Sequence, residues 1–158
     1  MFGEKLVALF GAILASSVVL VGSLRANPEE PWTPKQTVQA ADFVSELQQK
    51  KDPYPTVIYV GAKALYEGAH IPGAVFYGTG STEQGLTDLT KFAATLPKNS
   101  DVVLYCGCCP LEKCPNLRPA FVALKENGFA RLRVLILPTS FNTDWVEKGF
   151  PVRKGEKP

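Results

Sequence analysis

The sequence predicts an α/β domain with a mostly parallel central sheet and helices on both faces. Short apolar runs typical of strands lie at 56–60, 74–77, 101–105 and 132–137. Segments with helical spacing of apolar residues separate these runs. Strands joined through helices need crossover connections, which give parallel pairing and helices packed against the sheet.

The helices are predicted from apolar residues spaced three or four positions apart. A first helix covers 40–49, and a second one ends before Pro97. A third helix begins near Pro119 and closes at Gly128, because glycine is typical of a helix end. We expect a short terminal helix around Trp145.

Two of the strands have the clearest signals. The run at 56–60 is rich in β-branched and aromatic residues and follows Pro53 and Pro55. The run at 101–105 is almost wholly apolar, as expected of a buried strand, and Cys106 follows it directly. Ligands of such folds bind beyond the carboxyl ends of the strands, so Cys106 falls where the chemistry is expected.

Composition limits the classes of function. The chain has 158 residues, of which 46% are hydrophobic and 20% charged, as in an ordinary globular domain. Its 17 Lys and Arg residues nearly balance its 15 Asp and Glu residues. Because the charges are so nearly balanced, the chain does not build the basic field that attracts phosphates. We therefore expect no nucleic-acid partner.

The first segment differs from the rest of the chain. Residues 6–24 carry no charge and are mostly aliphatic, aromatic or small. Their number fits both a signal peptide and a membrane anchor, so 1–25 is predicted as one of these, with the membrane as a partner if it is not cleaved. Residues 26–35 are proline-rich and typical of a linker, and 36–158 form the domain. We expect a periplasmic or other extracytoplasmic location, because Lys5 favours a cytoplasmic N-terminus.

Three stretches resemble the rhodanese family, and they occur in the family's order. Residues 68–74, Gly-Ala-His-Ile-Pro-Gly-Ala, are similar to a characteristic turn of the family. The 102–105 strand and Cys106 are similar to the strand that delivers the family's nucleophile, and 127–152 is similar to its closing segment. The resemblance implies a rhodanese-like domain and a sulfurtransferase with Cys106 as nucleophile.

The loop after Cys106 holds all four cysteines of the chain and is longer than the family's usual loop. A sulfurtransferase needs a thiolate and donors that stabilise a persulfide. We expect the reactive sulfur to face solvent. Amides from the next helix, a close approach of the backbone at a glycine and two nearby cations should stabilise its negative charge. The predicted site is the nucleophile Cys106 with loop residues Gly107, Cys108, Cys109, Lys113, Cys114 and Arg118.

In this interpretation Cys106 forms a persulfide and passes sulfur to a thiol acceptor, without a cofactor. The partners are a small sulfur donor or a thiol acceptor, which could be another exported protein. A second interpretation is a thiol–disulfide redox protein that uses the same four cysteines, with a disulfide between Cys109 and Cys114 as one candidate pairing. A metal-binding or partner-binding module is the third, and no metal is predicted because four ligands in one short loop are cramped.

Overall fold

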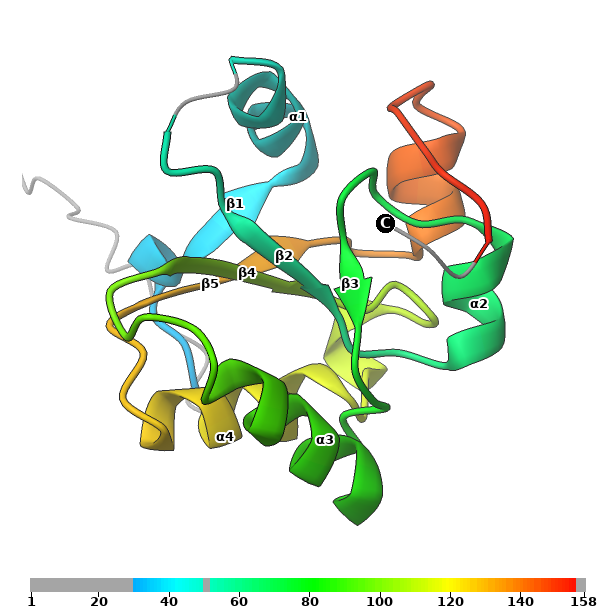
Figure 1. Cartoon of the computed structure of the whole chain (residues 1–158). Helices are drawn as coiled ribbons and strands as arrows, with labels where there is room; N and C mark the ends of the chain where they lie inside the picture. Colours follow the sequence, from blue (N-terminus) through cyan, green and yellow to red (C-terminus); the bar gives the residue numbers. More distant parts are fainter. Residues whose placement is uncertain (1–29, 50–51, 156–158) are drawn as a thin grey trace, which may run out of the picture.

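The computed structural model describes residues 30–49 and 52–155, which form a five-stranded sheet between two layers of helices (Figure 1). The strand order is β1-β5-β4-β2-β3, and every neighbouring pair is parallel. This confirms the predicted α/β class. The strands are β1 (Thr37–Gln39), β2 (Thr56–Tyr59), β3 (Val75–Phe76), β4 (Asp101–Tyr105) and β5 (Arg131–Ile136).

Helices α3 and α4 cover one face of the sheet, and α1, α2 and the last helical turn cover the other (Figure 1). The α-helices are α1 (Ala40–Gln48), α2 (Lys63–Gly68), α3 (Glu83–Ala93) and α4 (Leu117–Glu126). Shorter turns are η1 (Pro34–Gln36), η2 (Leu111–Lys113) and the π-helical η3 (Asn142–Val146). Among the described elements, β1, α2 and the turns η1 and η2 have no sequence prediction, because these short segments show no periodic pattern.

The N-terminal hydrophobic helix predicted within 1–25 lies outside the described residues. Among the residues that the structure does describe, no helix has the length and apolar character needed to cross a membrane.

The domain begins earlier than the sequence predicts. Trp32 is 7% exposed and packs edge-on against Phe121 of α4, with ring centroids 5.4 Å apart. Glu30 forms an ion pair with Arg118. The end of the predicted 26–35 linker is therefore part of the core. The free energy gained by burying the Trp32 indole holds this segment in place although its prolines disfavour regular structure.

The alternation of side chains along β4 decides where Cys106 points. Val102 and Leu104 pack with α3 and α4, whereas Val103 and Tyr105 pack on the opposite face. Cys106 continues this alternation one residue past the strand and joins the α3–α4 side of the core. The strand thus directs the sulfur toward the start of α4.

The candidate site lies where the carboxyl ends of β2 and β4 meet. Tyr59 is paired in register with Tyr105, and the Val60 amide donates to the Tyr105 carbonyl oxygen at 2.9 Å. The segment after β5 closes the same edge, because the Phe141 amide donates to the Gly107 carbonyl oxygen at 2.9 Å. The segments after β2 and β5 therefore flank the start of the cysteine loop.

Candidate active site

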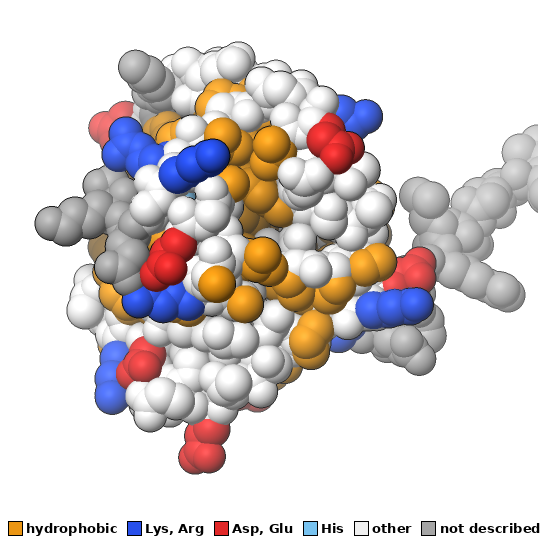
Figure 2. Space-filling view, turned by 90° about the vertical axis from the view of Figure 1, so that its right-hand side faces the viewer, with side chains coloured by type: hydrophobic (Ala, Val, Ile, Leu, Met, Phe, Trp, Pro, Cys, Tyr) orange, Lys and Arg blue, Asp and Glu red, His pale blue; other side chains and the backbone are white. Residues whose placement is uncertain are grey.

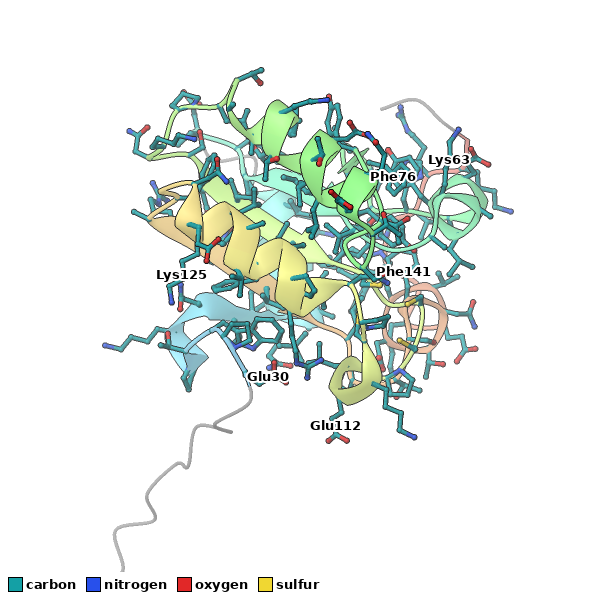
Figure 3. All side chains as sticks on the ribbon, turned by 90° about the horizontal axis from the view of Figure 1, so that it is seen from below. Glu30, Lys63, Phe76, Glu112, Lys125 and Phe141 are labelled. Carbon is teal, nitrogen blue, oxygen red and sulfur yellow. The ribbon has the colours of Figure 1, made fainter. Side chains whose placement is uncertain are left out.

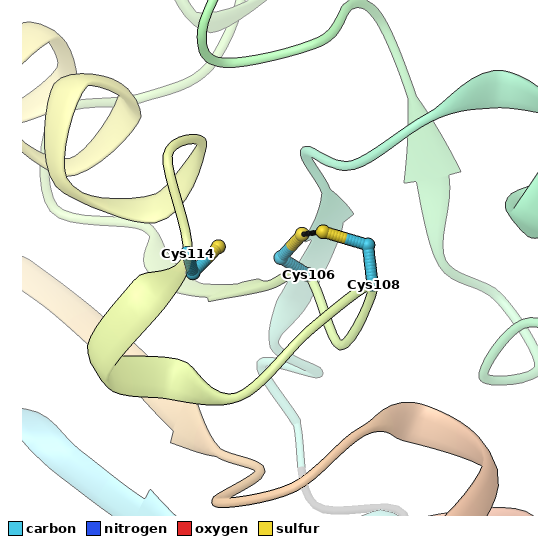
Figure 4. A group of neighbouring side chains, drawn as sticks. All are labelled: Cys106, Cys108 and Cys114. Atoms are coloured by element: carbon cyan, nitrogen blue, oxygen red, sulfur yellow. Dashed lines mark hydrogen bonds between the residues drawn. The ribbon is translucent and has the colours of Figure 1, made fainter.

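Three sulfur atoms form a compact cluster at this edge (Figure 4). The Cys106 thiol donates to Cys108 Sγ at 3.2 Å, and the Sγ atoms of Cys106, Cys108 and Cys114 all lie within 4.8 Å of one another. Cys109 Sγ is 3.4 Å from Cys108 Sγ. The fold thus brings all four predicted cysteines together, three as a close group and the fourth beside it.

The four cysteines differ in access to solvent. Cys106 is 1% exposed and Cys114 is 3% exposed, whereas Cys108 and Cys109 are half-buried. The Cys106 sulfur therefore does not face water as the sequence suggests, because the alternation of β4 turns it into the core. Cys108, two residues later, is the cluster member on the wall of a pocket.

The pocket opens at the carboxyl edge and has a volume of about 350 Å³. Its lining includes Tyr59, Leu65, Cys108 and Phe141, and none of the lining residues has a charged side chain. Figure 2 shows this side of the molecule, where hydrophobic side chains gather around a hollow and charged ones lie at the rim. A small, uncharged or weakly polar group fits this lining.

Asn116 directs its amide at the sulfurs. The Ser81 backbone N–H donates to Asn116 Oδ1 at 3.1 Å, which fixes the orientation of the side-chain amide. Asn116 Nδ2 then donates to Cys106 Sγ at 3.5 Å and to Cys108 Sγ at 3.6 Å. Asn116 is 4% exposed, so these bonds act in a region shielded from water, where they stabilise negative charge on sulfur strongly.

The cluster holds its first negative charge on Cys114. When Cys114 is ionised, the single thiol proton of Cys106 turns from Cys108 to the Cys114 sulfur. This hydrogen bond lowers the pKa of Cys114 from 9.0 to about 6, against the opposing effect of burial, and backbone N–H groups of Asn116 and Leu117 contribute. The hydrogen bond between Cys106 and Cys114, together with burial, raises the pKa of Cys106. The amides at the start of α4 thus stabilise a thiolate as predicted, but on Cys114 rather than on Cys106.

Cys109 is a poor thiolate at neutral pH. Burial, and then the hydrogen bond with Cys108, raise the pKa of Cys109 to about 12. All four cysteines are free thiols in the structure, and the disulfide between Cys109 and Cys114 stays a prediction.

Tyr59 and Gly61 form the other wall of the cluster. A Cβ atom on Gly61 would lie 2.3 Å from the Tyr59 hydroxyl oxygen and 2.9 Å from Cys106 Sγ, so only glycine fits between them. Tyr59 is 3% exposed, and its hydroxyl has no hydrogen-bond partner among the described residues. Burial and then the neighbouring cysteines raise the pKa of Tyr59, which keeps this hydroxyl as a donor.

The two predicted cations lie differently from the expectation. Arg118 donates to the carbonyl oxygens of Leu111 at 3.4 Å and Cys114 at 3.1 Å, and it pairs with Glu30 at 2.5 Å. It therefore braces the loop through the backbone. Lys113 is exposed on η2, and its neighbour Glu112 points away from the domain (Figure 3).

Gly107 is required by its own conformation and by a close neighbour. Its φ angle is +80°, in the left-handed region that favours glycine, and a Cβ atom there would lie 2.7 Å from the Phe141 backbone nitrogen. The close approach predicted at Gly107 thus exists, but it is made to the Phe141 segment rather than to a sulfur.

Solved structures with the same arrangement of strands and helices identify the fold. A rhodanese-like domain from Anabaena superposes with a TM-score of 0.55 at 22% sequence identity, covering 77% of this chain and 80% of its own. The chain has a rhodanese-like fold. A protein from Bacillus halodurans superposes on this chain with a TM-score of 0.58 at 20% identity, covering 76% of this chain and 77% of its own.

A thiosulfate sulfurtransferase from Pseudomonas aeruginosa also contains a similar unit. Its TM-score is 0.53 at 22% identity, and the match covers 77% of this chain but only 20% of the larger enzyme. No family model matches the chain, and no curated protein sequence does. At these identities the similarity establishes the rhodanese-like fold alone.

Sequence reasoning did not find Asn116 or Tyr59 as site residues. Asn116 lies ten residues after Cys106, and its role depends on the Ser81 amide from a distant segment. Tyr59 ends β2, whose carboxyl end lies beside that of β4, and this position at the carboxyl edge of the sheet is the signal that could have found it.

Proposed function

We propose that this domain transfers sulfane sulfur between small thiol compounds or proteins, with Cys108 as the cysteine that attacks the donor. The observation that carries the proposal is the position of Cys108. Its sulfur lies on the pocket wall, and the Cys106 thiol donates to it from behind at 3.2 Å. A ligand in the pocket reaches Cys108 before it can reach the buried Cys106.

The first half-reaction loads the cysteine. The Cys108 thiol loses its proton to solvent, and its thiolate attacks the outer sulfur of the donor. The new S–S bond forms on Cys108, the donor's own S–S bond breaks, and the rest of the donor leaves with the electron pair. With thiosulfate as donor the leaving group is sulfite.

In the second half-reaction an acceptor thiolate attacks the outer sulfur of the Cys108 persulfide. The persulfide S–S bond breaks, the acceptor keeps the sulfur atom, and Cys108 leaves as a thiolate. Asn116 Nδ2 donates to Cys108 Sγ, so it stabilises the negative charge of Cys108 before loading and after unloading.

The test is the intact mass of the reduced, full-length protein after incubation with a sulfane sulfur donor. We expect a gain of about 32 Da, one sulfur atom, which a thiol acceptor removes. Cys108→Ala should abolish the gain. Cys109→Ala is the matched control, because it removes the neighbouring half-buried thiol and should retain the gain.

Cys106→Ala separates the proposal from the prediction made by family resemblance. If Cys108 is the nucleophile, this variant still gains the sulfur atom. Loss of the gain in Cys106→Ala together with its retention in Cys108→Ala would show that Cys106 attacks the donor and that the pocket is not the route.

The short distance between Cys106 and Cys108 favours a second candidate, thiol–disulfide exchange. Cys108 attacks a partner disulfide and forms a mixed disulfide, and Cys106 then attacks Cys108 Sγ, which releases the partner as a dithiol. The product carries a Cys106–Cys108 disulfide and weighs about 2 Da less than the reduced chain. Incubation with a disulfide donor and no sulfane sulfur tests this directly, and an unchanged mass argues against it.

A further inference from the structure

We propose that Cys106, Cys108 and Cys114 also bind one soft metal ion, copper(I), through three sulfur ligands. Their Sγ atoms lie within 4.8 Å of one another (Figure 4). Metal–sulfur bonds are about 2.3 Å long, so three sulfurs around one ion are about 4 Å apart. Small side-chain rotations therefore suffice to place an ion between them.

The surroundings of the cluster suit bound thiolates. Asn116 Nδ2 donates to the sulfurs of Cys106 and Cys108, and the Cys106 and Cys114 side chains are almost fully buried. Several thiolates cannot share so small a buried space without a compensating cation. A bound ion replaces the thiol protons and supplies that charge.

Tyr59 gives an independent indication that the cluster has a bound state. Its hydroxyl is buried beside Cys106, across Gly61, without a hydrogen-bond partner among the described residues. A buried polar group without a partner is costly and calls for an explanation. A metal-bound thiolate is a strong acceptor, so the Tyr59 hydroxyl is placed to act as an outer-shell donor.

The number of ligands distinguishes copper(I) from zinc. Structural zinc sites use four protein ligands in a tetrahedron, whereas copper(I), which also prefers soft sulfur ligands, is satisfied by three sulfurs. Over residues 30–49 and 52–155 the group of mutually close ligands contains only the three cysteines. Cys109 contacts Cys108 but stands outside this group. Four zinc ligands would be cramped in this short loop, whereas three sulfurs around one copper(I) ion fit it.

Copper(I) and a persulfide would use the same sulfur of Cys108, so the two states exclude each other. Metal binding nevertheless does not depend on the proposed sulfur transfer, because it needs the three sulfurs and no pocket ligand. Each property can be measured without the other.

The test is an anaerobic titration of the reduced, full-length protein with copper(I) in competition with a coloured copper(I) chelator. We expect one ion per chain, with an ultraviolet sulfur-to-copper band. Cys106→Ser, Cys108→Ser and Cys114→Ser should each weaken binding at least about 100-fold, because even outer-shell changes at metal sites cost about 10- to 100-fold. Tyr59→Phe should weaken binding about tenfold.

Cys109→Ser is the matched control and should bind as the wild type does, and circular dichroism checks that each variant is folded. Equal loss of affinity in Cys109→Ser would overturn the three-sulfur site, as would tighter binding of zinc(II) than of copper(I). Absence of copper binding in a protein that still takes up sulfur sinks this inference alone. Copper binding without sulfur uptake leaves it standing and sinks the proposed function.

Discussion

Cys114 is the residue whose protonation couples the site to stability. Its pKa is about 6 in the fold against 9.0 for an unperturbed thiol, so the folded state favours the thiolate. This contribution to the free energy of unfolding is complete above about pH 9 and is lost as pH falls toward 6. For the reduced protein with a metal chelator, we expect the melting temperature to fall between pH 8.5 and pH 6.

The Cys114→Ser variant provides the control for this pH dependence. Serine does not ionise in this range, so the variant should melt at a temperature that changes much less between the two pH values. An unaltered pH dependence in Cys114→Ser would place the charge on another group. Differential scanning calorimetry at a series of pH values makes the comparison.

Asn116 acts on the sulfurs through the direction of its amide. In Asn116→Asp one carboxylate oxygen can still accept from the Ser81 amide, but the other places negative charge against Cys106 and Cys108. We expect sulfur loading to slow at least about tenfold, which corresponds to about 1.4 kcal/mol. The rate of the mass gain measures it.

Asn127→Asp is the matched change, because Asn127 is exposed at the end of α4 and bonds to the Ala123 carbonyl oxygen. It should load sulfur at the wild-type rate. Equal rates for all three proteins would remove Asn116 from the site.

At the scale of elements, the cysteine loop depends on a glycine that two constraints fix. In Gly107→Ala the new methyl group adopts an unfavourable φ and also meets the Phe141 backbone. Gly128 has a similar φ of +87° but open space around it. We expect Gly128→Ala to lower the free energy of unfolding by about 1–2 kcal/mol, and Gly107→Ala by at least about 1 kcal/mol more.

Urea unfolding of the two variants compares their free energies of unfolding. The difference separates the cost of the unfavourable φ, which both share, from the cost of the contact with the Phe141 backbone. Equal losses would mean that the contact between Gly107 and Phe141 is easily relieved, and that the loop is not held against the segment after β5.

Strands β2 to β5 and the longer helices could be predicted, because each is an apolar run or has a helical spacing of apolar residues of its own. Residues 101–105 are β4 as predicted, and the predicted helix over 40–49 is α1 within one residue. The face on which Cys106 lies could not be predicted, because β4 is apolar on both sides and alternation alone does not say which side holds α4. The interior of the loop depends on bonds to Ser81, Pro138 and Phe141, which come from distant segments.

At the scale of the whole molecule, the fold predicts where the site lies, and the pocket lining predicts which sulfur donors the site prefers. The pocket lining is uncharged, so a dianion must give up its hydration there without a compensating cation. We expect an uncharged organic trisulfide to load Cys108 at least about ten times faster than thiosulfate at equal concentration. Faster loading from thiosulfate would mean that the donor binds elsewhere.

The four cysteines in one loop at the end of a strand were enough to predict where the sulfurs cluster. Their differences in exposure and hydrogen bonding could not be predicted, because these sulfurs are only 3.2–3.4 Å apart and their surroundings come from distant segments. Cys106 lies at the end of β4, where the nucleophile was predicted, whereas Cys108 lies on the pocket wall. The assignment of the nucleophile therefore depends on the tertiary structure.

The most direct measurement is the rate at which each cysteine of the reduced, metal-free protein is alkylated by a small reagent, followed by peptide mass spectrometry. Cys108 should be labelled first, Cys109 more slowly because its pKa is about 12, and the buried Cys106 and Cys114 last. Labelling of Cys106 before Cys108 would contradict the account, because the sulfur at the end of β4 would then be the one that meets the donor.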